Sequence, residues 1–272
     1  MSISFNRNRT QVAFEQLIGV SNPGMLKNKK TDFKSYTLQP MDVINLAYYL
    51  NQDAVDFFFN GVLSFSEGID SVFQRRFSWA TVKLYYSIYY LIRASLAAQG
   101  VAVLQNSGMF RLKIKNSEKP FSKGGRKYNS THEGTINHYR DLCSDTDLLL
   151  ANHIGDSDVY EWMHDIRNIV NYRSSSFQEP QYLDIWKSFV PMLDNGTLPI
   201  FLDLLENDEY ILCFQEEFAV IGIPIKRLKQ TIEDMAIHSL LQNLASDKEV
   251  FVKNVIGYDD RSLTILRQIF QR

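Results

Sequence analysis

The chain has 272 residues, a hydrophobic content of 45% and a formal net charge of −2 at pH 7. These values are typical of a globular protein with a full core, and they exclude global basicity as a reason to expect nucleic-acid binding. The only cysteines, Cys143 and Cys213, lie far apart in the sequence, so we expect neither a disulfide framework nor a cysteine metal site. The N-terminus lacks the apolar stretch of a signal peptide, and the most apolar window, 84–98, is too short for a membrane span. We therefore expect a cytoplasmic protein with no membrane segment and no cofactor.

Helical spacing of apolar residues organises the first hundred residues. Residues 1–40 are expected to form an N-terminal extension with one short helix. The ranges predicted as helices are, in chain order, 10–18, 41–52, 53–74 and 79–98. Ser78 is the predicted N-cap of the last helix, and Gly100 is its predicted stop. The two long helices are expected to run antiparallel across a short corner.

The helical spacing breaks after residue 100. Short strands are predicted over 101–104 and 110–114, with a loop at 122–127, and further helices are predicted over 158–173, 181–192 and 199–205. Beyond these, the pattern predicts strands over 210–214 and 218–223, a stop at Pro224, and helices over 225–244 and 262–270. The predicted regions are thus an extension (1–40), a helical domain (41–205) with an insertion at 101–157, and a small α+β region (206–272).

The predicted helix near residues 162–173 gathers polar side chains that can carry chemistry. One side is predicted to hold Trp162, Ile166, Ile169 and Val170, together with Arg173. The other side is predicted to hold His164, Arg167, Asn168 and Asn171, because residues three and four apart are neighbours on a helix. A base, a fixed cation and two amides on one side of a packed helix indicate either a functional site or a polar network that fixes helix packing or a dimer interface.

Two segments of the chain resemble HEPN-type helical domains. The helix at 78–98, with its Tyr-Tyr pairs and Arg-Ala-Ser-Leu ending, resembles an early core helix of that superfamily. The stretch from Arg167-Asn168 to Tyr172 resembles its motif of Arg, a polar residue and a later His. The helical organisation is also similar to that of the YaaC-like proteins. Over about residues 41–195, the resemblance implies a mainly α fold: a HEPN-like antiparallel helical bundle with a basic insertion and a small α+β C-terminal appendage.

This resemblance implies a bacterial defence or toxin-type protein that acts on or binds RNA. In the metal-independent ribonucleases of the family the Arg binds the scissile phosphate and the His moves protons, which implies the first role for Arg167. The chain has Tyr172 where the motif has His, so we expect His164, on the same helix side, to supply the base. Asn168 and Asn171 complete the candidate catalytic set. The resemblance also implies a homodimer in which two copies place their motifs across one cleft.

A basic segment lies inside the predicted insertion. Residues 111–127 contain seven Lys or Arg residues and a single Glu, and the aromatic residues Phe110, Phe121 and Tyr128 lie in or directly beside this segment. The candidate nucleic-acid contacts in this segment are Lys113, Lys115, Lys123, Arg126 and Lys127. Such a pattern is typical either of a surface that follows a phosphate backbone or of a solvated loop. His132 and His138 are six residues apart and fall on different helix faces, so no metal site is predicted.

The competing interpretation is an interaction protein. In that case the chain would be a noncatalytic helical adaptor, or a regulatory subunit of an operon-encoded multi-protein defence assembly, and the polar side of the 162–173 helix would serve packing alone.

Overall fold

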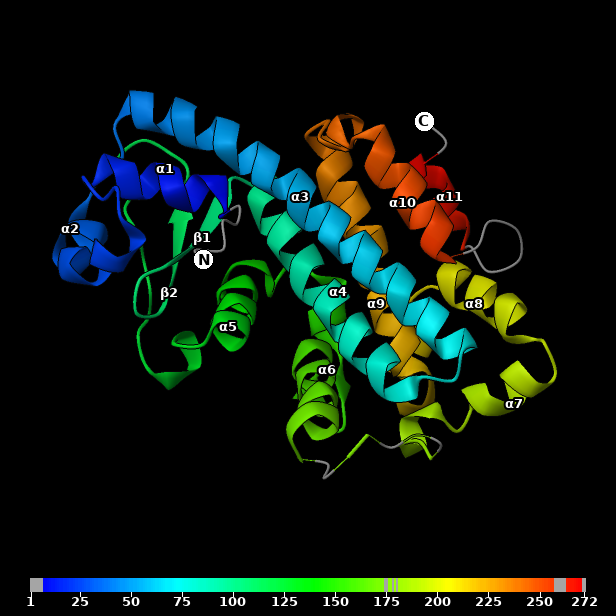
Figure 1. The fold of residues 1–272 in the computed structure, drawn as a ribbon. Coiled ribbons are helices and arrows are strands. Elements are labelled where there is room, and N and C mark those ends of the chain that lie inside the picture. Colours follow the sequence, from blue (N-terminus) through cyan, green and yellow to red (C-terminus); the bar gives the residue numbers. More distant parts are fainter. Residues whose placement is uncertain (1–6, 174–175, 178, 180, 257–262, 271–272) are drawn as a thin grey trace, which may run out of the picture. The chain divides into compact units, whose positions relative to one another are not determined.

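The computed structural model describes residues 7–173, 176–177, 179, 181–256 and 263–270 (Figure 1). The chain is mainly helical, as predicted, and the described residues form two short antiparallel sheets. Contacts divide the chain into two compact units, one formed by 1–57 and 92–142 and the other by 58–91 and 143–272. These units group residues by contact, whereas the sequence predicts consecutive regions. The division into 1–40, 41–205 and 206–272 therefore stays a prediction.

Helices α3 (Pro40–Phe73) and α4 (Phe77–Ala98) contribute to both units. The predicted boundary between residues 52 and 53 is wrong, because α3 continues through a stretch that contains no Pro or Gly to interrupt it. The predicted cap at Ser78 is also shifted, since α4 already begins at Phe77. The backbone N–H and the hydroxyl of Ser78 donate instead to the Glu179 carboxylate, at 2.6 and 2.7 Å.

Two glycines let α3 and α4 approach closely in the second unit. A Cβ atom at Gly61 would lie 2.7 Å from the Leu91 side chain, and one at Gly68 would lie 2.9 Å from the Leu84 side chain. A larger residue would therefore force the helices apart, although glycine lowers helix propensity by about 1 kcal/mol. The later glycine meets the earlier leucine, so the helices run antiparallel, as predicted (Figure 1).

The first unit packs short elements around the β1–β2 hairpin. Its remaining elements are α1 (Arg9–Leu17), a 3-10 helix (Pro23–Lys29), α2 (Lys30–Ser35), β1 (Val101–Gln105), β2 (Met109–Lys113), a 3-10 turn (Arg126–Tyr128) and α5 (Thr131–Cys143). The hairpin confirms the two strands predicted here, with Val101 opposite Lys113. Its core includes Phe33, whose ring makes edge contacts with the rings of Phe14 and Phe110 at 5.1 and 5.2 Å. Helix α5 was not predicted.

The second unit is built from helices that surround α9. In chain order its further elements are a 3-10 helix (Leu148–Ala151), β3 (His153–Ile154), β4 (Ser157–Asp158), α6 (Val159–Asn168), a π-helical turn (Ile169–Arg173), a 3-10 helix (Asp184–Trp186), α7 (Phe189–Asp194), α8 (Leu198–Asn207), a 3-10 helix (Leu212–Phe214), α9 (Glu216–Ile237), a 3-10 helix (Leu241–Asn243), α10 (Ser246–Ile256) and α11 (Thr264–Phe270). None of the described helices combines the length and the apolar character needed to cross a membrane.

The C-terminal region corrects the sequence prediction. The strands predicted over 210–214 and 218–223 are wrong, because a 3-10 helix occupies Leu212–Phe214 and α9 begins at Glu216. Helix α9 also runs through Pro224, where a stop was predicted. The stretch from Ala219 to Leu228 is buried throughout, so packing on all sides stabilises a helix that proline alone would interrupt. The described residues beyond 206 are thus helical rather than α+β. The predicted last helix is seen as α11, while Ser262 lies outside the described residues.

Candidate functional site

Helix α6 positions the candidate catalytic residues. Asp158 is its N-cap, because the Asp158 carboxylate accepts hydrogen bonds from the backbone N–H groups of Tyr160 and Glu161 at 2.9 and 3.1 Å. The buried side chains that continue the packing face are Trp162, Met163, Ile166 and Val170. This burial agrees with the predicted apolar face at Trp162, Ile166 and Val170, whereas Ile169 is only half-buried and Arg173 is exposed.

A π-helical turn over Ile169–Arg173 continues α6 and explains this difference. Its i to i+5 hydrogen bonding widens the helix, and such turns occur frequently at functional sites. Because the wider turn changes the angular position of the residues that follow, Tyr172, five residues after Arg167, lies beside the arginine. The Tyr172 ring centroid lies 5.0 Å from the guanidinium carbon while the residue stays 71% exposed. Uniform α-helical spacing would not place these two residues together.

Arg167 is buried, with an exposed fraction of only 6%. Its Nη1 donates to the Asn168 side-chain oxygen at 2.9 Å, and its Nη2 donates to the Tyr86 hydroxyl at 3.2 Å. The guanidinium carbon also lies 5.3 and 5.5 Å from the ring centroids of Tyr85 and Tyr86. Tyrosine rings and an amide, rather than a carboxylate, therefore surround the cation.

The positive charge of Arg167 has no acidic partner in the part of the chain that the structure describes. Its Nε is buried and has no hydrogen-bond acceptor among these residues. A guanidinium has five N–H donors, and here only two of its three nitrogens donate to neighbouring side chains. Because an uncompensated buried charge is costly, this arrangement favours an anion as the missing partner.

His164 adjoins this cluster through Asn168. The Asn168 side-chain nitrogen lies 3.3 Å from each ring nitrogen of His164, and the Asn168 oxygen accepts from Arg167. The His164 ring lies 5.7 Å from the Tyr85 ring, and its side chain is 25% exposed. One amide thus links a titratable ring to a fixed cation, at the rim of a buried cluster.

The structure therefore brings together four of the five predicted catalytic residues, namely His164, Arg167, Asn168 and Tyr172. Asn171 is half-buried, and its side chain forms no hydrogen bond with any described residue. Tyr85 and Tyr86 were missing from the predicted set, although the Tyr-Tyr pairs of the 78–98 helix were visible in the sequence. We name the group of Tyr85, Tyr86, His164, Arg167, Asn168 and Tyr172 the Arg167 cluster.

A row of aromatic side chains along α4 leads to the Arg167 cluster. Between Trp79 and Tyr90, four residues are not buried: Trp79, Lys83, Tyr86 and Tyr90. Their spacing of three or four places them on one side of the helix. The Tyr86 and Tyr90 rings lie 6.3 Å apart, and the Trp79 ring lies 5.2 Å from that of Phe177. A partly exposed aromatic stripe therefore joins the exposed ring of Tyr172 within the second unit.

The basic segment at 111–127 belongs to the first unit. The Lys123 ammonium binds the Asp141 carboxylate at 2.6 Å, and this hydrogen bond raises the pKa of Lys123. Burial favours a higher pKa for Asp141, but its hydrogen bonds with Lys123 and Tyr128 outweigh burial and lower it. Lys123 is therefore paired, an arrangement that a count of charges within the segment does not reveal.

The other candidate contacts in the basic segment are Lys113, Lys115, Arg126 and Lys127. All four are exposed, and none forms an ion pair with a described residue. The Phe121 ring is 46% exposed and lies 4.8 Å below the guanidinium of Arg111. Contact between this basic segment and a nucleic acid stays a prediction.

His138, for which the sequence predicts no metal-binding role, is fully buried. Its Nε2 lies 3.0 Å from the carbonyl oxygen of Met109, and burial lowers its pKa. No cluster of three or more His, Cys, Asp or Glu residues within the described ranges has the geometry to hold a metal ion.

Comparison with known proteins found no matching family model and no significant match among curated proteins or solved structures.

Proposed function

We propose that this protein binds single-stranded RNA through the Arg167 cluster, in keeping with the resemblance to HEPN-type domains. The observation that carries the proposal is a buried guanidinium that forms no ion pair with any described carboxylate. A phosphate of the RNA backbone would supply the missing negative charge. Arg is the side chain best suited to this contact, because its planar fork matches phosphate oxygens and it stays charged at any physiological pH.

The exposed aromatic rings favour single strands over duplexes. Unstacked bases pack on aromatic side chains, whereas the bases of a duplex are already stacked on each other. Tyr172 offers an exposed ring next to the proposed phosphate position, and Tyr86, Tyr90 and Trp79 extend the aromatic surface along α4. Trp79 and Tyr90 are separated by roughly 16 Å of helix axis, enough for several contacts along one strand.

Metal-independent cleavage of the bound RNA is a second candidate function, favoured by the contact of His164 with Asn168. In this role Arg167 would stabilise the scissile phosphate, and His164 would accept or donate a proton during attack by the ribose 2′-hydroxyl. A homodimer that joins two Arg167 clusters would place two histidines near one phosphodiester, so that one can act as base and the other as acid. A defence or toxin-type role would follow from such an activity.

Fluorescence anisotropy with a labelled single-stranded RNA tests the proposed binding. Arg167→Ala should weaken binding about 10- to 100-fold, the usual range for a charge-assisted contact. The affinity of Arg167→Lys should lie between that of Arg167→Ala and that of the wild type, because lysine keeps the charge but lacks the planar guanidinium. Arg75→Ala is the matched control, since it removes an exposed arginine of the same unit that pairs with Asp194. Equal affinity of Arg167→Ala and Arg75→Ala would contradict the proposal and favour a structural role in a helical adaptor.

The cleavage candidate is tested by incubating the same RNA with the wild type in the presence of EDTA. Accumulation of fragments with 2′,3′-cyclic phosphate ends, abolished in His164→Ala, is the expected result. Intact RNA after prolonged incubation with a protein that binds it would restrict the function to binding.

A further inference from the structure

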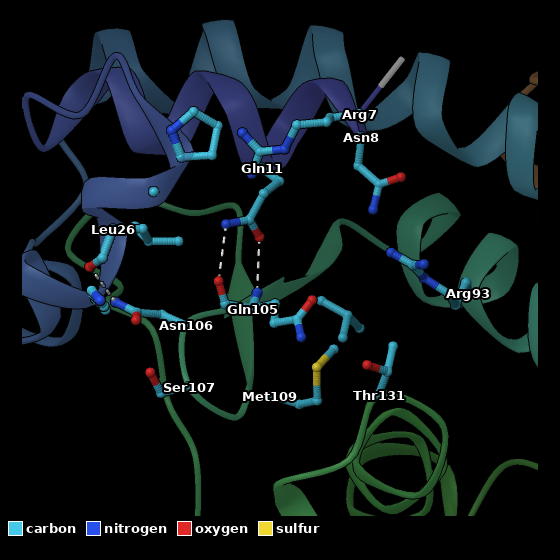
Figure 2. A pocket seen from close by; sticks show the side chains of 14 residues that line it. Arg7, Asn8, Gln11, Leu26, Arg93, Gln105, Asn106, Ser107, Met109 and Thr131 are labelled. Carbon is cyan, nitrogen blue, oxygen red and sulfur yellow. Dashed lines mark hydrogen bonds between the residues drawn. The ribbon is translucent and has the colours of Figure 1, made fainter. Parts of the chain in front are cut away.

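The first unit contains a cavity of about 520 Å³ that has no part in the proposed RNA site (Figure 2). Its walls come from α1, the 3-10 helix Pro23–Lys29, the C-terminal part of α4, the β1–β2 hairpin and the first residue of α5. Sites for small molecules usually have volumes in this range and combine apolar walls with a few polar groups. The cavity is therefore large enough for an organic molecule rather than only for an inorganic ion.

The charges that line the cavity are all positive. Arg7, Lys27 and Arg93 contribute side chains, whereas no Asp or Glu is among the lining residues. Arg7 is neutralised, because it binds both carboxylate oxygens of Glu15, at 2.8 and 2.5 Å. Lys27 is exposed and forms no ion pair within the described ranges. The electrostatics of the cavity therefore favour an anionic ligand.

Arg93 is held in a defined orientation at one wall. Its guanidinium carbon lies 4.0 Å from the centroid of the Phe57 ring, so the aromatic face fixes the plane of the guanidinium. In Figure 2 the guanidinium of Arg93 points from α4 into the same space as the side-chain amide of Asn8, the N-cap residue of α1. A guanidinium group that packing already holds in place loses little conformational entropy on binding, which suits recognition of a phosphate group.

Hydrogen bonds fix the opposite wall in advance. The side chain of Gln11 pairs with the backbone of Gln105 through two hydrogen bonds, of 2.8 and 3.1 Å (Figure 2). The Asn106 side chain donates to the carbonyl oxygen of Leu26 at 3.4 Å, which ties the hairpin turn to the 3-10 helix. The cavity thus does not require large rearrangement before a ligand enters.

Polar groups without partners remain around the same space. The side chains of Asn8, Ser107 and Thr131 form no hydrogen bonds with other described residues. Ser107 has a φ of 52°, which is unusual for a residue other than glycine, and it lies at the tip of the hairpin on the cavity rim. Leu26 and Met109 add apolar surface between these groups. A polar, partly flat molecule with one anionic end would satisfy both kinds of surface.

From this combination we propose that the cavity binds a nucleoside monophosphate. The phosphate would bind Arg93, and Lys27 would add positive charge elsewhere on the cavity wall. The nucleoside would contact Asn8, Ser107 and Thr131 while its base packs on Leu26 and Met109. This inference goes beyond the proposed RNA binding and does not depend on it, because no residue of the Arg167 cluster lines the cavity.

Isothermal titration calorimetry of the full chain with AMP, GMP, CMP and UMP, each added separately, tests the proposal. At least one nucleotide should bind, and it should bind more tightly than inorganic phosphate, because the cavity offers contacts to the nucleoside. Lys27→Met and Arg93→Lys should each weaken this binding by about tenfold or more, the first by removing a charge and the second by removing the fork. Lys30→Met is the matched control, since Lys30 is exposed nearby and does not line the cavity.

Three results would overturn the nucleotide site: no binding of any of the four nucleotides at millimolar concentration, equal affinity for inorganic phosphate, or wild-type affinity in both Lys27→Met and Arg93→Lys. Circular dichroism spectra establish that each variant is folded. Lys27 is exposed, so Lys27→Met removes a charge without disturbing the packing of Arg93 against Phe57. Retention of nucleotide binding in Arg167→Ala would separate this site from the proposed RNA site.

Discussion

The second unit contains two buried arginines whose surroundings differ in kind. The Arg227 side chain has no exposed surface, and its guanidinium nitrogens lie 3.3 Å from the carboxylates of both Asp147 and Asp234. Thr231 and Gln230 accept further hydrogen bonds from it, at 3.0 to 3.1 Å. Its charge and most of its donors are satisfied within the protein. Arg227 therefore serves to join α9 to the segment around Asp147.

The Arg167 cluster surrounds its cation with dipoles and rings instead of carboxylates. Tyrosine rings, a hydroxyl and an amide stabilise a guanidinium by weaker interactions than a carboxylate does, and they leave its net charge unbalanced. Burial alone therefore does not distinguish a structural arginine from one that can bind a ligand. The chemistry of the neighbours does, and it is the reason to place the proposed RNA contact at Arg167.

The largest difference between the two arginines should appear in stability. Arg227→Met should lower the free energy of unfolding by about 3–5 kcal/mol, because it leaves the fully buried Asp147 carboxylate without its cation. Arg167→Met should change it by less than about 1 kcal/mol, since lost hydrogen bonds are offset by removal of an unbalanced buried charge. Urea denaturation followed by circular dichroism measures both. Similar losses in the two variants would remove the distinction between them.

An intermediate effect is expected at the exposed ring of the Arg167 cluster. Tyr172→Ala should weaken single-stranded RNA binding by about 1–3 kcal/mol, the usual contribution of one stacked base, whereas Tyr172→Phe should retain most of the affinity. The residue is 71% exposed, so neither change should reduce stability appreciably. Anisotropy titrations with the same RNA provide the measurement. Wild-type affinity in Tyr172→Ala would mean that the ring does not stack on a base.

The smallest expected effect is a change in the salt dependence of RNA affinity. If Arg167 contacts one phosphate, Arg167→Ala should reduce the slope of log K against log salt by about 0.7, or roughly threefold in affinity over a fourfold change in salt. The cost of Arg227→Met should barely depend on salt, because buried pairs are little screened. Titrations at several potassium chloride concentrations test both statements. An unchanged slope in Arg167→Ala would show that the arginine acts through the fold rather than on a phosphate.

Local sequence patterns were enough to predict most of the helices and the β1–β2 hairpin of the first unit. Regular apolar spacing predicts an amphipathic helix from local information alone, so α4, the start of α6 and the β1–β2 pair were predicted close to their observed bounds. The sequence also singled out Arg167, Asn168 and His164 as neighbours, because three- and four-residue spacing fixes which side chains share a helix side.

The surroundings of these side chains depend on tertiary contacts, which local patterns do not predict. Helix α9 passes through Pro224 because packing buries it on all sides, and the π-helical turn that brings Tyr172 to Arg167 breaks the regular spacing on which sequence analysis depends. The partners that separate the two arginines come from distant segments: Asp147 lies 80 residues from Arg227, and Tyr86 lies 81 residues from Arg167. Local spacing carries no information about such contacts, since they form only when the chain folds back on itself.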